Sequence, residues 1–587
     1  MRIYRWTGVL LLCIANAWSP LVVGAETPPS LAGVWAAQRR FGPDLRGQLT
    51  IERRGDAWVA HIGGHSAPVN VDKSALTFQI AGARGSFRGE RDGESLRGFW
   101  IQPGGVMFGP VASPVELHFA GPNLWRGVVD PLEDSARFFL VVTRRDDGTL
   151  AAFLRNPERN LGVFLQADRL VVEGSSLALR GRRRGQSADV VLGSGRYDVD
   201  NDRISLYFAS RGGSYDFERI TDDPESDYYA RSLKPVPYVY HEPLPRDDGW
   251  PTAAVDEVGI SQERIGEFVQ MLADLPDNAV DASNIHAVLL ARHGKLVLEE
   301  YFHGHSGEDP HDLRSASKSL TSIMVGNAIM RHEPLTLATP VFETMSDGPL
   351  PADLDPRKRA MTAEHLLSMS SGFHCDDSDS NAPGNEDAMQ EQTQQPDWYK
   401  YTLAVPMIEA PGKRAVYCSA NPNLLGGMLA RTTHTWLPDY FRDRIAAPMG
   451  IRRYHLPITP TGEMYMGGGV RMLPRDFMKF GQVMLDQGVW RGKRIVDADW
   501  VQRSAEPRFE LAGIHYGFLW WITEYTYDHR KLRAYFAGGN GGQVVLVVPE
   551  LDLVFAAYGG NYGSRATLIP QREYVPKYIL PAIENTH

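Results

Sequence analysis

Ser315 and Lys318 stand three residues apart at the start of a segment with helical spacing of apolar residues, at Leu320, Ile323 and Ala328. Residues three apart on a helix are neighbours, so the two side chains would project together. A serine hydroxyl needs a base before it attacks a carbonyl, and a lysine can serve when its pKa is lowered. The pair predicts a nucleophile and its activating group. The alternative is a plain helix N-terminus with a surface lysine.

Two later segments fit the same chemistry. Tyr417-Cys418-Ser419 precedes an apolar run that predicts a helix, and a tyrosine phenol can relay a proton when a cation such as Lys318 stands beside it. Residues 538–543 are rich in glycine and lead into the strand-like run 544–548. Such a backbone can approach a ligand closely and aim an N–H group at a developing oxyanion.

Three motifs in this order, Ser-x-x-Lys, Tyr-x-Ser and a glycine-rich turn into a strand, resemble those of the penicillin-recognising serine hydrolases. The chain resembles the branch that holds class C β-lactamases, D-alanyl-D-alanine carboxypeptidases, family VIII esterases and 6-aminohexanoate-dimer hydrolases. Segments 365–372, 467–469, 474–477 and 516–521 also look like this branch. The resemblance implies an α/β fold like that of β-lactamases and penicillin-binding proteins, with an antiparallel sheet and a helical cluster.

The resemblance also implies roles for individual residues. Ser315 resembles the acylated nucleophile, Lys318 the residue that activates it, and Tyr417 the proton shuttle. The backbone N–H groups of Ser315 and Gln543 resemble the oxyanion hole. No cofactor and no metal are implied.

Two positions depart from the family pattern. Ser419 stands where many relatives have Asn, and Asn540, next to Gly541 and Gly542, stands where relatives carry a Lys or His that holds a substrate carboxylate. A neutral amide binds a carboxylate less well, because charge-assisted hydrogen bonds are roughly twice as strong as neutral ones. These four residues are predicted to bind substrate, and the neutral Asn540 favours esters or uncharged amides over β-lactams and D-amino-acid peptides.

The chain divides by composition into two parts. Residues 30–234 carry many short strand-like runs separated by turn signals, which predicts an all-β accessory domain, either a barrel or a sandwich. Residues 235–251 contain five prolines and predict a semi-rigid linker. Residues 252–587 then form the β-lactamase-related serine hydrolase domain.

The first 25 residues have the pattern of a secretory signal. Arg2 and Arg5 precede a short apolar stretch at 8–17, and small residues stand before Glu26. The stretch is too short to span a bilayer, so residues 1–25 predict a cleaved signal peptide and an exported protein, periplasmic or secreted. An uncleaved anchor is the alternative. No later stretch reaches 18 apolar residues, so no membrane span is expected in the mature chain.

The chain has three cysteines, and Cys13 would leave with the signal peptide. The two that remain in an exported protein, Cys375 and Cys418, predict a disulfide. The alternative is a pair of buried free thiols. Because Cys418 follows Tyr417, the disulfide would fix the segment that carries the proton shuttle.

Charge and motif content exclude several classes of protein. The net charge of -10 argues against a nucleic-acid partner. No His-Glu-x-x-His motif or Cys/His cluster predicts a metal site, and the acidic segment 376–397 lacks the glycine and final acid of a calcium loop. That segment is predicted to be a solvated loop near the site mouth. Trp520-Trp521 more often belongs to a core than to a substrate platform. The oligomeric state stays open.

The sequence therefore predicts an exported serine hydrolase that cleaves an ester or amide of a small molecule or short peptide through an acyl-enzyme. One alternative is a D-amino-acid peptidase or β-lactamase-like enzyme. The other is a non-catalytic binding protein that has the same fold.

Overall fold

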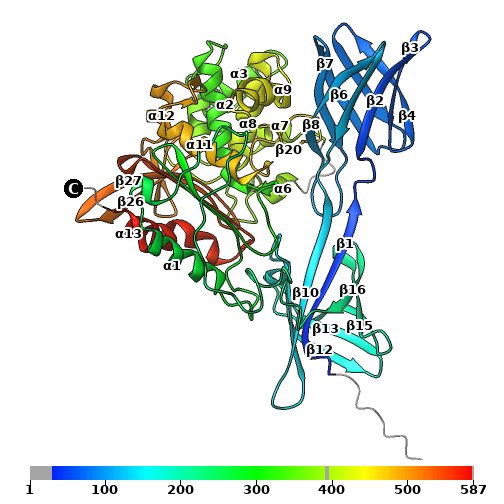
Figure 1. Cartoon of the computed structure of the whole chain (residues 1–587). Helices are drawn as coiled ribbons and strands as arrows, with labels where there is room; N and C mark the ends of the chain where they lie inside the picture. Colours follow the sequence, from blue (N-terminus) through cyan, green and yellow to red (C-terminus); the bar gives the residue numbers. More distant parts are fainter. Residues whose placement is uncertain (1–29, 391–395, 585–587) are drawn as a thin grey trace, which may run out of the picture.

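The computed structural model describes residues 30–390 and 396–584. The predicted signal peptide lies outside the described residues. An N-terminal all-β region lies beside a C-terminal domain of helices and an antiparallel sheet (Figure 1). Both parts of the predicted fold class are confirmed, whereas the predicted domain boundaries stay predictions.

The first of two barrels in the N-terminal region closes where β8 pairs with β9. Strand β5 shows why this sequence forms a barrel wall, because its buried and exposed residues alternate strictly, with Leu76, Phe78 and Ile80 inside. The strands are β2 (Gly47–Arg54), β3 (Ala57–Ile62), β4 (His65–Asp72), β5 (Ala75–Ile80), β6 (Gly85–Asp92), β7 (Ser95–Gln102), β8 (Val111–Gly121) and β9 (Leu124–Val129).

The second barrel combines β1 with β10 to β16. Because β1 pairs with β10, the whole first barrel is inserted in the chain between these two neighbouring strands. The sequence predicted one barrel or sandwich and did not reveal this nesting. The strands are β1 (Gly33–Gly42), β10 (Asp134–Arg144), β11 (Leu150–Arg155), β12 (Leu165–Glu173), β13 (Ser176–Arg183), β14 (Val190–Asp198), β15 (Arg203–Phe208) and β16 (Gly213–Arg219).

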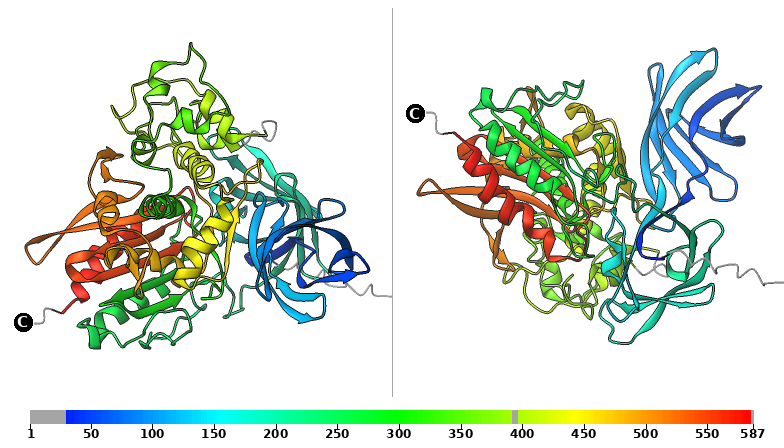
Figure 2. Two further views of the ribbon diagram at one scale, coloured as in Figure 1. Left: turned by 90° about the horizontal axis from the view of Figure 1, so that it is seen from above. Right: turned by 60° about the horizontal axis from the view of Figure 1, so that its bottom comes forward.

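The C-terminal domain is built on an eight-stranded antiparallel sheet in the order β18-β17-β29-β28-β27-β26-β25-β24. Helices α1 (Gln262–Ala273) and η8 (Pro570–Ile579) pack on one face, and the helical cluster packs on the other (Figure 2). The strands are β17 (Ile285–Arg292), β18 (Lys295–Tyr301), β24 (Phe509–Leu511), β25 (Ile514–Tyr516), β26 (Trp521–Tyr527), β27 (Arg530–Gly539), β28 (Gln543–Val548) and β29 (Leu553–Gly559).

Helix α2 lies in the centre of the helical cluster, and its residues from Lys318 to Ala328 are all buried. The sequence pattern predicted burial of one face only. The burial is complete because the sheet, α8 and neighbouring segments surround the helix. The longer or site-bearing helices are α2 (Lys318–Met330), α5 (Ala363–Leu367), α6 (Glu386–Gln390), α7 (Trp398–Ala404), α8 (Ala420–Thr433), α11 (Pro474–Leu485) and α12 (Ala498–Ser504).

The two parts of the chain share a sheet. Strand β8 of the first barrel pairs with β20 (Tyr454–Pro457), which pairs with β21 (Arg471–Met472), which pairs with β19 (His311–Asp312). Figure 1 shows β8 and β20 side by side. Segment 235–251 contains no helix or strand and packs on the C-terminal domain, where Trp250 Nε1 donates to the Arg475 carbonyl at 3.1 Å.

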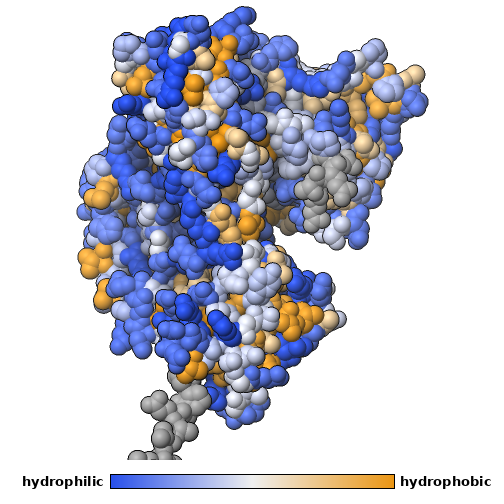
Figure 3. Space-filling model, turned by 90° about the vertical axis from the view of Figure 1, so that its right-hand side faces the viewer, coloured by the Kyte–Doolittle hydropathy of each residue, from blue (hydrophilic) through white to orange (hydrophobic). Residues whose placement is uncertain are grey.

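The face with the barrels is mostly polar, with hydrophobic residues in small separate groups (Figure 3). Among the described residues, no helix combines the length and the apolar character needed to cross a membrane.

Candidate active site

The predicted nucleophile lies in a 3₁₀ turn, η4 (Arg314–Ser317), directly before α2. Side chains at i and i+3 eclipse in a 3₁₀ turn, so Ser315 and Lys318 are brought together by local geometry. Lys318 Nζ donates a hydrogen bond to Ser315 Oγ at 2.9 Å. The lysine is 1% exposed, whereas Ser315 is half-buried and faces the cavity described below.

The charge on Lys318 is set by its neighbours. Burial alone would lower the pKa of Lys318. The Tyr417 phenol and the carboxyl groups of Glu386 and Asp377 outweigh that effect and raise the pKa above its ordinary value. The sequence suggested that a lowered pKa would make this lysine a base. The structure instead surrounds it with acids, so it stays an ammonium group at neutral pH.

Tyr417 lies beside that ammonium group. Its ring centroid is 5.0 Å from Lys318 Nζ, within cation–π range. The ring also stacks on Trp521, with centroids 5.7 Å apart and planes 20° apart. The structure therefore brings the three predicted catalytic residues, Ser315, Lys318 and Tyr417, to one place.

Asp377 connects the acidic loop to the tyrosine motif. Its backbone N–H donates to the Tyr417 carbonyl at 3.0 Å, and its Oδ2 accepts from the N–H and the hydroxyl of Ser419, at 2.8 and 2.6 Å. Burial raises the pKa of Asp377 to about 6; Lys318 opposes this rise and Glu386 adds to it. The loop was predicted to be solvated near the site mouth. Asp377 in this loop is instead hydrogen-bonded to the segment that contains Tyr417 and Ser419.

Ser419 is fully buried, and its hydroxyl is engaged by Asp377. It is not among the residues that line the cavity next to Ser315. Its place in the structure is therefore that of a support for the tyrosine motif, while its predicted contact with substrate stays a prediction.

The glycine-rich motif begins on β27, which packs against the nucleophile turn. A methyl group at Gly539 would lie 2.5 Å from the Leu313 carbonyl oxygen and 2.8 Å from the Ala316 nitrogen. Only glycine allows this approach. Gln543 lies one strand further, on β28, as the register partner of Gly539. Its side chain donates to the Gly559 carbonyl at 2.7 Å, so the amide is held inside the sheet.

The turn between β27 and β28 contains the other predicted substrate-binding residues. Gly541 and Gly542 have φ of +99° and +95°, a backbone conformation that favours glycine. Asn540 is exposed, and its Oδ1 accepts a hydrogen bond from the Gly563 N–H at 3.0 Å. Among the residues of this motif, Gly538, Gly539, Asn540 and Gln543 line the cavity beside Ser315.

That cavity has a volume of about 280 Å³ and opens next to Ser315 and Tyr417. Its walls are mainly apolar. The apolar side chains are Ala512, Ile514, Trp521, Phe536, Val544 and Leu568. Trp521 thus contributes to the cavity, whereas Trp520 is fully buried. The tryptophan pair, which the sequence assigned to the core, is divided between core and cavity.

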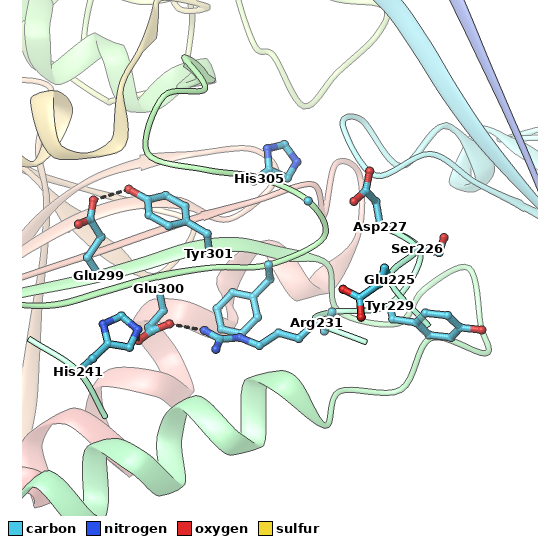
Figure 4. A pocket seen from close by; sticks show the side chains of 13 residues that line it. Glu225, Ser226, Asp227, Tyr229, Arg231, His241, Glu299, Glu300, Tyr301 and His305 are labelled. Carbon is cyan, nitrogen blue, oxygen red and sulfur yellow. Dashed lines mark hydrogen bonds and ion pairs between the residues drawn. The ribbon is translucent and has the colours of Figure 1, made fainter. Parts of the chain in front are cut away.

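A larger cavity of about 480 Å³ lies near β18, away from the nucleophile (Figure 4). Two of its acidic residues pair with arginines. Glu299 Oε1 accepts from Arg475 Nε at 2.8 Å, and Glu300 pairs with Arg231. The predicted catalytic residues Ser315 and Tyr417 line the cavity described above and not this one.

Cys375 and Cys418 form a disulfide that closes a loop of 43 residues. Both residues are buried. The disulfide joins the start of the acidic loop to the residue after Tyr417, so the covalent link and the Asp377 hydrogen bonds act on the same short segment.

Comparisons with known proteins agree with this geometry. The family model described as Beta-lactamase matches residues 281–561. A 6-aminohexanoate-dimer hydrolase of Paenarthrobacter ureafaciens is 26% identical over 297 residues, which are 46% of this chain and 74% of the relative. Both matches support the resemblance of the C-terminal part of the chain to the penicillin-recognising serine hydrolase superfamily.

The chain is also similar to solved structures of other proteins. A penicillin-binding protein of Bacillus halodurans matches at 16% identity with a TM-score of 0.40, over 50% of this chain and 96% of that one. An octameric penicillin-binding protein homologue of Pyrococcus abyssi matches at 17% identity with a TM-score of 0.40, over 51% and 75%.

Sequence reasoning missed three contributors to the site. Asp377 stood in a loop of many acids, and nothing in the sequence set it apart. Gly539 was noted only as one of several glycines. Gln571, on η8, lines the cavity with a buried Oε1 that has no hydrogen-bond partner within the part of the chain that the structure describes. No periodic pattern in the sequence indicates it.

Proposed function

We propose that this protein is an exported serine hydrolase that cleaves an ester or amide through an acyl-enzyme on Ser315. The observation that carries the proposal is the hydrogen bond of 2.9 Å from the buried Lys318 ammonium group to Ser315 Oγ, beside Tyr417. A lysine with only a structural role could be buried beside an acidic side chain without any contact to a serine. Lys318 instead contacts the Ser315 hydroxyl, next to the cavity.

The proposed acylation forms a bond between Ser315 Oγ and the substrate carbonyl carbon and breaks the bond to the leaving oxygen or nitrogen. The serine proton passes to Tyr417, which gives its own proton to the leaving group. Lys318 keeps its charge and stabilises the negative charge that develops on the serine and tyrosine oxygens. The Ser315 N–H and an N–H from the turn at 539–543 stabilise the oxyanion. In deacylation, a water oxygen attacks the acyl carbonyl carbon and gives a proton to Tyr417, the Ser315 Oγ–acyl bond breaks, Tyr417 returns a proton to Ser315 Oγ, and the carboxylic acid leaves.

The cavity supports an apolar substrate portion next to the reacting bond. Its walls are rings and aliphatic side chains, and its unpaired acceptor, Gln571 Oε1, suits a hydroxyl or amide N–H group of the substrate. This combination supports the ester and amide classes predicted from Asn540.

The test is labelling of the mature protein with a fluorophosphonate, read by intact mass, together with Ser315→Ala. The expected result is one adduct on the wild type and none on the variant. Hydrolysis is then measured on p-nitrophenyl esters, the 6-aminohexanoate dimer and a chromogenic cephalosporin. Folded protein without an adduct would contradict the proposal and favour a non-catalytic binding protein.

One observation supports a second candidate, a D-amino-acid peptidase or β-lactamase-like enzyme. Arg572 lines the cavity and makes no ion pair among the residues 30–390 and 396–584. A free guanidinium could hold a substrate carboxylate in place of the cation that Asn540 lacks. Turnover of the cephalosporin that is lost in Arg572→Gln, with ester hydrolysis retained, would favour this candidate.

A further inference from the structure

A buried carboxylate lies just before the nucleophile turn. Asp312 is 8% exposed, and its Oδ2 lies 3.4 Å from Arg314 Nε, 3.3 Å from Arg471 Nη2 and 3.8 Å from Arg159 Nη2. Burial would raise the pKa of Asp312, but these three guanidinium groups hold it well below its ordinary value. The carboxylate therefore stays charged and ties three arginines to one point.

The residue that Asp312 holds is the one before the nucleophile. Arg314 has a φ of +48°, the left-handed region that residues with a side chain rarely adopt. Asp312 Oδ1 accepts its backbone N–H at 3.1 Å. The Arg314 carbonyl accepts hydrogen bonds from the Gly469 N–H at 3.2 Å and from the Ser317 hydroxyl at 2.8 Å. These contacts set the direction in which the chain enters Ser315.

One of the three arginines comes from the N-terminal β region. Arg159 follows β11 of the second barrel, in a segment that reaches into the C-terminal domain. In that segment the Pro157 carbonyl accepts a hydrogen bond from Asn284 Nδ2 at 2.7 Å and lies 2.9 Å from His286 Nε2. Arg159 is thereby fixed next to Asp312 by contacts on both sides of the junction.

The first barrel reaches the same residue through the backbone. The shared sheet runs from β8 through β20 and β21 to β19, and β19 ends at Asp312. Ser113 Oγ and His455 Nδ1, 2.7 Å apart and buried, add a side-chain link between β8 and β20. Both barrels are thus connected to Asp312. The second barrel is connected through the Arg159 side chain, and the first through the shared sheet.

We propose that Asp312 is a positioning residue for Ser315 and that the N-terminal β region acts on the active site through it, by means of Arg159. The β region is then a part of the catalytic unit and not only a shield or a partner-binding module. This inference rests on the proposed serine hydrolase function.

The experiment compares Arg159→Met, Arg159→Lys and Asp312→Asn in the full chain. The rate of fluorophosphonate labelling, kcat and KM for a p-nitrophenyl ester, and the Tm are measured for each. Arg453→Met is the matched control, because Arg453 Nη2 also pairs across the junction, with Asp130 at 3.1 Å, but does not contact Asp312.

The expected result is a fall of about tenfold in labelling rate and kcat for Arg159→Met, with KM unchanged, partial rescue in Arg159→Lys, and wild-type rates in Arg453→Met. If Asp312→Asn does not fold, the comparison of Arg159→Met with Arg159→Lys still tests the proposal. A labelled wild type with an unchanged rate in Arg159→Met would overturn this inference alone. A wild type without an adduct would overturn the proposed function and this inference together.

Discussion

Asp377 accepts two hydrogen bonds from Ser419 through the same oxygen, one from the backbone at 2.8 Å and one from the hydroxyl at 2.6 Å. The carboxylate thus fixes the residue two positions after Tyr417 while contributing negative charge near Lys318. Its ionisation state should matter to catalysis, and its raised pKa of about 6 makes that state accessible to experiment.

Asp377→Asn should lower kcat about tenfold at pH 7.5, because hydrogen bonds to a charged group contribute ~1.5–3 kcal/mol and a part of this is lost. In the wild type, kcat/KM should fall as the pH drops through about 6, where Asp377 takes up a proton. The pH profile of the variant should lack this inflection. Asp379→Asn, an exposed acid in the same loop, is the control.

Stability should change with pH in the opposite direction to activity. The folded-state pKa of Asp377 lies above its ordinary value of 3.8, so the folded protein binds this proton more tightly than the unfolded chain does. The contribution of Asp377 to the free energy of unfolding should therefore rise as the pH falls from about 6 to about 4. The wild-type value minus the Asp377→Asn value, from urea unfolding at several pH values, measures it. A difference that does not vary with pH would contradict the assignment.

Gly539→Ala should reduce the rate of fluorophosphonate labelling at least about tenfold. The added methyl group would lie 2.5 Å from the Leu313 carbonyl oxygen and 2.8 Å from the Ala316 nitrogen, so the strand or the nucleophile turn must shift. Gly348→Ala, at an exposed position where a Cβ meets no atom within 4 Å, tests the effect of a glycine substitution elsewhere in the same domain. Wild-type labelling in Gly539→Ala would show that the turn tolerates the shift.

Removal of the disulfide by Cys375→Ala with Cys418→Ala should lower the free energy of unfolding by about 4 kcal/mol, the value that chain entropy gives for a closed loop of 43 residues. Activity should also fall, because the segment around Tyr417 would be held only by the Asp377 hydrogen bonds and no longer by the disulfide. Intact mass with and without reductant should differ by about 2 Da in the wild type only. An unchanged wild-type mass would contradict the bond.

Trp521→Ala should raise KM for p-nitrophenyl esters with long acyl chains more than for the acetate. The ring forms a wall of the cavity, and each buried CH₂ group contributes ~0.8 kcal/mol, so lost contact area affects long chains selectively. The acetate serves as the internal control within the same variant. An equal change for all chain lengths would place the apolar part of the substrate elsewhere.

The sequence by itself determined the parts of this protein that depend on local geometry, and the cysteine pairing, for which only three cysteines are present. Ser315 and Lys318 meet because their spacing matches one helical turn, and Cys375 and Cys418 pair after Cys13 is assigned to the signal. Short strand-like runs separated by turn signals were enough to predict an all-β N-terminal region, because both signals depend only on residues close together in the sequence.

Only the tertiary structure decided which acid reaches Lys318, which glycine touches the nucleophile turn, and that the β region is joined to the active site. Asp377, Gly539 and Arg159 each act on residues far away along the chain. Their types are common in the sequence, so no local pattern distinguishes the one that packs against the site. The charge on Lys318 followed from the same cause, because its pKa depends on neighbours that folding alone brings close.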